Sequence, residues 1–227
     1  MPGQLLRRKK AVLAICRFCY QNWEHPCIGS SLATICIRAN NDPNIEDIHE
    51  WWMNQAPLDA ARNEAVLIAR SRSATHILMV DNDQVPDLDP SKPFWTTAWN
   101  HAWTYGDPCV VVAPIQAADG TVCVHKDVVD GEGKHHLRRM TAEDVAGKTG
   151  VERVPGSNVA LALIDMRIFD ALPVPWFRFE YEKPFHNRVT ATEDILFTGA
   201  LARYDIPVFC AWQAWCGHVK DKILGKP

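Results

Sequence analysis

The sequence predicts an α/β protein with a mostly parallel central β-sheet. Short runs of β-branched and other apolar residues alternate along the chain with longer segments whose apolar residues recur at helical spacing. The balance of 47% hydrophobic to 22% charged residues over 227 positions is that of a globular protein with a sizeable core. No internal repeat or low-complexity segment interrupts this pattern, so we expect one domain over residues 1–227.

The individual elements follow from the position of each run. The expected strands are residues 11–16, 48–53, 75–80, 110–115, 159–164 and 207–212. The expected helices are residues 28–38, 57–70, 94–103, 166–171 and 192–204. The helix over 57–70 has the clearest signal, because it is rich in Ala, Leu, Glu and Arg and has Pro at its start. Residues 119–150 are polar and predict an irregular or hairpin-like insertion, and residues 219–227 form a basic tail.

Composition excludes some broad classes of protein. The formal net charge of −3 removes the general electrostatic argument for a nucleic-acid or anionic-membrane partner. No apolar stretch approaches the roughly 20 residues that span a bilayer. The apolar run that follows the basic start covers only residues 11–16 and ends at Arg17, which is too short for a secretion signal. We therefore expect a cytoplasmic protein with no transmembrane segment, whose eight cysteines are reduced.

The most informative motif is Asp81-Asn82-Asp83, at the end of the strand expected over 75–80. A strand that ends in two carboxylates places them at the sheet edge where open α/β folds bind ligands. Oxygen ligands suit a hard divalent cation, which shares them with the phosphates of a substrate. The alternative interpretation is that these residues only stabilise the turn that follows the strand.

Five short blocks, in this order, resemble a small GT-A-type glycosyltransferase close to the family 2-like enzymes of bacteria and their phages. They are Ala61-Arg62-Asn63, Asp81-Asn82-Asp83, Pro155-Gly156-Ser157-Asn158, Thr192-Glu193-Asp194 and Gly217-His218. The resemblance covers residues 11–219 and implies a GT-A (Rossmann-like) three-layer sandwich. It also implies a hexosyltransferase-like activity that moves a sugar from a nucleotide-diphosphate sugar to a hydroxyl acceptor.

The resemblance implies that the first two blocks and the end of the chain bind the nucleotide-sugar donor. It implies that Asp81, Asp83 and His218 bind Mn²⁺ or Mg²⁺. It further implies that Arg62 and Asp81 contact the donor, a UDP- or GDP-sugar, and that Lys220 in the tail lies over the diphosphate. The metal would offset the charge that develops on the leaving diphosphate.

The resemblance assigns the acceptor side to the later blocks. Asp194 is the expected general base and Glu193 orients the acceptor or a neighbouring group. Close approach of a sugar is expected at the glycine-containing segment, and Trp176 is the best candidate for stacking on a sugar ring. The residues of that segment are Gly156, Ser157 and Asn158.

Several alternatives stay open at this point. The pair Glu193-Asp194 also suits the first turn of a helix capped by Thr192, and a lone His218 also suits a structural role. The reaction is expected to invert the sugar, although retention is not excluded.

A sugar-phosphate nucleotidyltransferase is one alternative. Such an enzyme is expected to have a glycine-rich phosphate loop after the first strand, and segment 17–22 contains no glycine. Another rival is a non-catalytic carbohydrate- or nucleic-acid-binding module. The basic run 134–139 leaves open a modified DNA base as the acceptor, in a phage context. The sequence does not define the oligomeric state.

Overall fold

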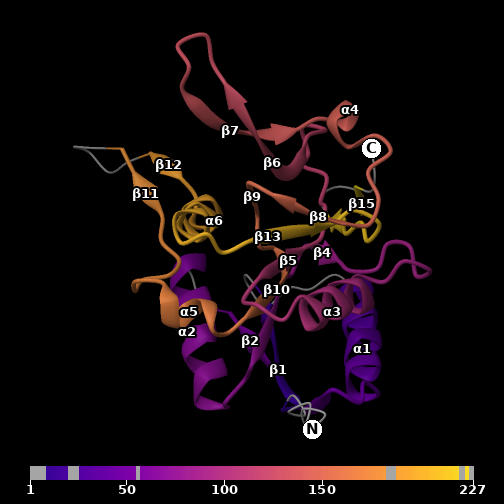
Figure 1. The fold of residues 1–227 in the computed structure, drawn as a ribbon. Coiled ribbons are helices and arrows are strands. Elements are labelled where there is room, and N and C mark those ends of the chain that lie inside the picture. Colours follow the sequence, from indigo (N-terminus) through magenta and orange to yellow (C-terminus); the bar gives the residue numbers. More distant parts are fainter. Residues whose placement is uncertain (1–8, 20–25, 55–56, 183–187, 220–222, 225–227) are drawn as a thin grey trace, which may run out of the picture.

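The computed structural model describes residues 9–19, 26–54, 57–182, 188–219 and 223–224. Its centre is a seven-stranded sheet in the order β2-β1-β3-β10-β5-β13-β8 (Figure 1). The strands are β1 (Ala11–Phe18), β2 (Ile45–Met53), β3 (His76–Asp81), β5 (Val110–Val112), β8 (Val151–Val154), β10 (Leu161–Asp165) and β13 (Val208–Ala211).

The strand directions confirm the predicted sheet. Strand β1 is parallel to β2 and β3, and β13 is parallel to β5. Strand β10 is antiparallel to both β3 and β5, and β8 is antiparallel to β13. Five of the seven strands in this described sheet therefore run in one direction, and their carboxyl ends share one edge.

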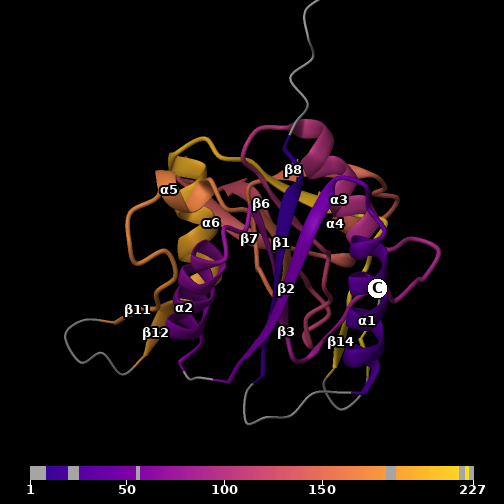
Figure 2. The same ribbon diagram turned by 90° about the horizontal axis from the view of Figure 1, so that it is seen from below.

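Helices cover both faces of the sheet, which makes three layers (Figure 2). One face carries α1 (Pro26–Asn40) and α3 (Phe94–Tyr105), whose buried residues form one core with alternate residues of β1 and β3. The other face carries α2 (Leu58–Ser71), α5 (Ile168–Ala171) and α6 (Glu193–Arg203), which form the second core. The predicted α/β class, with a Rossmann-like three-layer sandwich, is confirmed.

The segment predicted as an irregular or hairpin-like insertion contains a hairpin. Strands β6 (Val122–Val129) and β7 (His135–Met140) pair with each other and project from the body of the protein (Figure 1). The other side of β6 pairs with β9 (Gly156–Ser157), and α4 (Ala142–Val145) follows β7. The hairpin therefore extends a three-stranded sheet, β7-β6-β9, that lies next to the central sheet.

Short strands that the sequence did not predict complete the fold. Strand β4 (Gln84–Val85) pairs with β14 (Gly217–Val219), which also pairs with β15 (Ile223–Leu224). Strands β11 (Glu180–Tyr181) and β12 (Val189–Ala191) form a separate ribbon. Two- and three-residue strands carry too little periodicity to be recognised from sequence. Within the described residues, no helix has both the length and the apolar character needed to cross a membrane.

Candidate functional site

The Asp81-Asn82-Asp83 segment lies at the carboxyl edge of the central sheet, as the sequence predicts. Asp81 is the last residue of β3 and lies opposite Phe18, the last residue of β1. Its backbone N–H donates to the carbonyl of Ala160 at 2.8 Å, and the N–H of Asn82 donates to the carbonyl of Phe18 at 2.9 Å. Neighbouring strands therefore fix the backbone of this segment on both sides.

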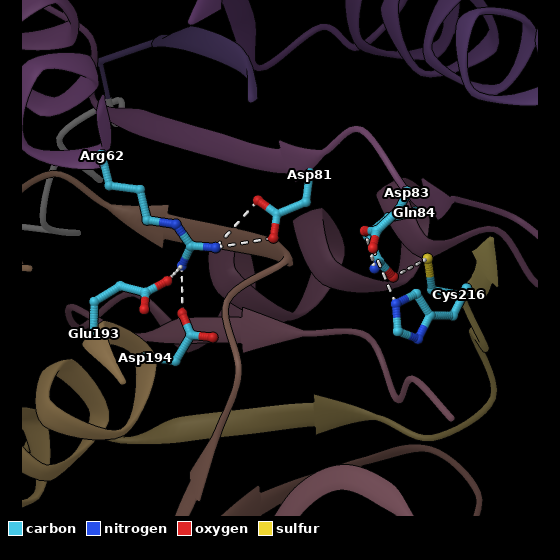
Figure 3. Close-up of polar contacts among 8 residues, drawn as sticks. Arg62, Asp81, Asp83, Gln84, Glu193, Asp194 and Cys216 are labelled. Carbon is cyan, nitrogen blue, oxygen red and sulfur yellow. Dashed lines mark hydrogen bonds and ion pairs between the residues drawn. The ribbon is translucent and has the colours of Figure 1, made fainter. Parts of the chain in front are cut away.

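Arg62 of α2 lies at the centre of the first cluster of the site, which we call the Arg62 cluster (Figure 3). Its side chain is fully buried, and its Nη2 donates to both carboxylate oxygens of Asp81 at 3.0 and 3.1 Å. Its Nη1 donates to Asp194 Oδ1 and lies 3.7 Å from Glu193 Oε1. One guanidinium thus joins β3 to the start of α6.

The Arg62 cluster contains more negative than positive charge. Three carboxylates surround a single cation, and buried charges are stable only when they are compensated. Burial raises the pKa of Asp81 to about 7, against the opposing effect of Arg62 and with further increases from Asp194 and Asp83. Burial and the neighbouring Asp194 also raise the pKa of Glu193. The cluster therefore favours binding of a proton or a further cation nearby.

The placement of Arg62 differs from the one that the resemblance implies. The guanidinium is 0% exposed, its Nη1 and Nη2 contact three carboxylates, and its Nε is buried without a partner among the described residues, so burial keeps it from a donor phosphate. Its contacts instead hold the two acidic blocks together, so we treat Arg62 as a positioning residue.

The start of α6 explains how its two acids reach Arg62. Thr192 is in the N-cap position with an extended backbone, but its side chain makes no capping hydrogen bond. The carboxylates of Glu193 and Asp194 lie in the first turn and point toward Arg62 (Figure 3). Asp194 uses Oδ1 for this contact, while its Oδ2 makes no hydrogen bond to any described residue. One oxygen of Asp194 therefore remains available to accept a proton.

Asp83 and His218 form the second part of the site, the Asp83–His218 pair. Strand β4 pairs with β14 so that His218 lies opposite Gln84, directly after Asp83. His218 Nε2 lies 3.1 Å from Asp83 Oδ2, and Gln84 Nε2 donates to Asp83 Oδ1 at 2.6 Å. The two side chains are 28% and 13% exposed, so the pair is more accessible than the Arg62 cluster.

The hydrogen bonds of His218 suit a cation at this pair. His218 Nδ1 lies 3.0 Å from the carbonyl oxygen of Gln116, which can only accept, so Nδ1 carries a proton. A neutral imidazole then directs the lone pair of Nε2 at the carboxylate of Asp83. Two acceptors at 3.1 Å require either a second proton or a metal ion. When two ligand atoms lie at right angles around one ion, each about 2.1 Å from it, they are about 3 Å apart. This separation is close to the 3.1 Å between His218 Nε2 and Asp83 Oδ2.

The structure brings together two of the three predicted metal ligands. Asp83 and His218 are in contact, whereas Asp81 is turned toward Arg62. Among the residues that the structure describes, no group of three or more His, Cys, Asp or Glu side chains is arranged to hold a metal. The side chains that would hold a metal ion here are thus one carboxylate and one imidazole.

The predicted glycine-containing segment lies beside α6. A Cβ built on Gly156 would approach Thr198 Oγ1 to 3.2 Å, so this position allows β9 to lie close to the helix. Ser157 is fully buried and its hydroxyl donates to the carbonyl of Cys123 at 2.9 Å, which gives it a structural role. Asn158 is half-buried, and its side-chain oxygen is buried with no hydrogen-bond partner.

The prediction that Trp176 stacks on a sugar needs correction. Its side chain is 5% exposed, it packs edge-on against Phe169, and its Nε1 donates to the carbonyl of Phe169 at 3.0 Å. Because neither ring face is open, Trp176 belongs to the core. Asn63 fixes the same loop, since its Oδ1 accepts from the backbone N–H groups of Trp176 and Phe177.

Sequence analysis missed three polar residues next to this site. Gln84 and Gln116 orient Asp83 and His218, and His125 of β6 is buried opposite Gly156. The position of Gln84 directly after Asp83 is the only sequence signal for any of them. Lys220, predicted to contact the diphosphate, lies outside the described residues.

Comparisons with known proteins identify the fold but no family. No protein-family model matches the chain, and no curated protein sequence matches it. A197 from STIV shares 13% identity with a TM-score of 0.58, over 95% of this chain and 88% of A197. At this identity the likeness shows a shared fold alone.

Two further solved structures are similar at a lower level. A putative glucose-1-phosphate thymidylyltransferase from Bacillus anthracis, in complex with a sucrose, shares 9% identity with a TM-score of 0.48 over 92% of this chain and 89% of the other. HddC from Yersinia pseudotuberculosis shares 10% identity with a TM-score of 0.37 over 92% and 93%. Both TM-scores are too low to carry an argument.

Proposed function

We propose that the protein is a metal-dependent glycosyltransferase that moves a sugar from a nucleotide-diphosphate sugar to a hydroxyl acceptor. The observation that carries the proposal is the Asp83–His218 pair at the carboxyl edge of the sheet, a carboxylate oxygen and an imidazole nitrogen 3.1 Å apart that suit a divalent cation. The ordered sequence blocks that resemble family 2-like enzymes supply the reaction type.

On the donor side, Asp83 and His218 would hold Mn²⁺ or Mg²⁺. The bound metal would supply positive charge to the leaving diphosphate. Gln84 and Gln116 keep the two side chains in place, as second-layer hydrogen bonds do around metal ligands. The acidic surplus of the Arg62 cluster adds to the attraction for a cation.

On the acceptor side, Asp194 is the proposed base. Arg62 holds Oδ1, which leaves Oδ2 to accept the proton of the acceptor hydroxyl. The hydroxyl oxygen forms a bond to the anomeric carbon as the bond from that carbon to the diphosphate oxygen breaks. The products are a glycoside and a nucleoside diphosphate, and the proton resides on Asp194.

The test is a donor-hydrolysis screen. UDP-, GDP-, CDP- and TDP-sugars are incubated with Mn²⁺, with and without EDTA, and release of nucleoside diphosphate is measured for the wild type and for Asp83→Ala. The matched control is Asp127→Ala, which breaks an exposed Asp–His pair of 2.6 Å on the hairpin. A parallel reaction with nucleoside triphosphate and glucose 1-phosphate tests the nucleotidyltransferase alternative.

We expect one donor to release its nucleoside diphosphate only with metal, in the wild type and Asp127→Ala but not in Asp83→Ala. Formation of pyrophosphate in the parallel reaction would instead support the nucleotidyltransferase. If no nucleotide binds in a metal-dependent way by calorimetry, the donor-site proposal is wrong.

A further inference from the structure

A cavity of about 250 Å³ lies between α6 and the loop that joins α5 to β11, and neither the sequence motifs nor the proposed reaction uses it. One wall consists of residues between Leu172 and Arg178 in the loop. The other wall consists of Leu196, Ala200 and Arg203 of α6, with Tyr204 directly after the helix. Because pockets for drug-sized ligands start at roughly 300 Å³, this cavity suits a smaller molecule.

The cavity is separate from the proposed active site. Successive residues of an α-helix are rotated by about 100° around its axis. Leu196 and Arg203 are therefore about 200° and 180° away from Asp194, on the opposite side of α6. A ligand in the cavity thus contacts a different face of the helix from the one that carries the proposed base.

The walls are apolar, and hydrogen bonds already fix the loop. Val174 and Tyr204 are large side chains that are 72% and 52% exposed, and both line the cavity. Asn63 Oδ1 accepts from the backbone N–H groups of Trp176 and Phe177, which holds the loop against α2. Because the loop is held before a ligand arrives, binding costs less conformational entropy.

The charged side chains around the cavity are both positive. Arg178 and Arg203 line it, whereas no Asp or Glu among the described residues does. Neither arginine has an ion pair or a side-chain hydrogen bond within the described part of the chain. The acid nearest in sequence, Asp205, is already paired with Arg153 of β8 at 2.7 Å. The cavity therefore carries positive charge that the described structure does not compensate.

We propose that this cavity binds a small organic anion, namely a carboxylate or phosphate that carries an apolar group. The guanidinium groups of Arg178 and Arg203 hold the acidic group, because their N–H donors match carboxylate and phosphate oxygens. The apolar group packs against Val174 and Leu196. This inference does not depend on the proposed glycosyltransferase activity.

The test is a titration followed by NMR at the cavity itself. Protein with ¹³C-labelled Leu and Val methyl groups is titrated with phenylacetate, hexanoate and phenyl phosphate, and with the neutral analogues phenylacetamide and benzyl alcohol. The methyl resonances of Leu172, Val174 and Leu196 report on the cavity. Those of Leu88, an exposed residue that does not line the cavity, serve as the internal reference.

The variants are Arg178→Gln, Arg203→Gln and the double variant. The matched control is Arg138→Gln, because Arg138 is an exposed arginine of β7 that also has no ion pair within the described part of the chain. The methyl spectra also show whether each variant is folded.

We expect at least one of the three anions to shift the resonances of Leu172, Val174 and Leu196 but not those of Leu88. Each single variant should weaken binding about fivefold, as the loss of one exposed ion pair predicts, and the double variant should weaken it further. The neutral analogues should bind at least about fivefold more weakly, and Arg138→Gln should bind as the wild type does. High salt should weaken binding of the anions.

Three results would overturn the inference. The first is that no anion shifts the three cavity resonances. The second is that a neutral analogue binds as tightly as its anionic counterpart, or that the folded double variant binds the anions as tightly as the wild type. The third is an equal loss of binding in Arg138→Gln, which would show a general attraction of anions to the surface and no specific site.

Discussion

Asp81 and Asp83 are two residues apart, yet they belong to different environments. Asp81 is turned inward to a fully buried arginine, and burial raises its pKa to about 7. Asp83 is turned to His218 and an amide, with 28% of its side chain exposed. One acidic motif can therefore supply both a structural ion pair and a candidate ligand, according to which partner the fold brings to each residue.

Removal of Arg62 should have the largest effect on stability. Arg62→Ala leaves three carboxylates in the interior without their cation, so we expect a loss of about 3–5 kcal/mol in the free energy of unfolding. The matched control is Arg70→Ala on the same helix, where the pair with Asp170 is exposed and worth under about 1 kcal/mol. Chemical denaturation measures both. Equal losses would contradict the central role of Arg62.

The Asp83–His218 pair should affect metal binding much more than folding. His218→Gln removes the imidazole, so we expect Mn²⁺ affinity to fall by about 10–100-fold with little change in unfolding without metal. Calorimetric titration with Mn²⁺ measures the affinity, and His135→Gln, at the exposed pair on the hairpin, is the control. Unchanged Mn²⁺ binding in His218→Gln would show that the pair is only a structural contact.

A pH series separates Asp81 from its neighbours. Its pKa is higher when folded than when unfolded, so the folded state binds more protons and loses stability as pH rises from about 4 to 7. The Asp81→Asn variant imitates the protonated form. Over this pH interval we expect its free energy of unfolding to rise by roughly 2 kcal/mol relative to that of the wild type. In thermal unfolding with EDTA present, the unfolding temperature of the variant should rise by about 5 °C relative to that of the wild type over the same interval.

Asp144 provides the control for this series. Its pKa is lowered to about 2 by its hydrogen bond with Lys126, so it is ionised throughout the interval when folded. Asp144→Asn should therefore show a nearly constant difference from the wild type above pH 5. A constant difference for Asp81→Asn as well would mean that Asp81 is not the group that titrates.

The smallest effect concerns the contact between β9 and α6. Gly156→Ala pushes against Thr198 Oγ1, and we expect a loss of about 1 kcal/mol. Gly199→Ala, inside α6 with open space around it, should instead stabilise the protein by about 0.5–1 kcal/mol. Denaturant midpoints measure both, and the same sign for the two variants would contradict the close packing at Gly156.

The sequence predicted those parts of the site that depend on a single strand or motif. The run 75–80 placed Asp81 and Asp83 at the sheet edge, because a strand's direction and end are local properties. The burial of Arg62 and Trp176 could not be predicted in this way, since both depend on which helices and loops pack together. The contact of Gln116 with His218 joins segments far apart in the chain and accompanies the β4–β14 pairing.

That pairing also sets when the site can form. His218 and Asp83 are 135 positions apart, and Asp194 and Arg62 are 132 positions apart. Synthesis proceeds from the N-terminus, so a growing chain can build β1, β2, β3 and α2 long before Asp194 and His218 exist. The carboxyl edge of the sheet is completed only after β14 leaves the ribosome, and the nascent protein therefore carries no finished site while it is being made.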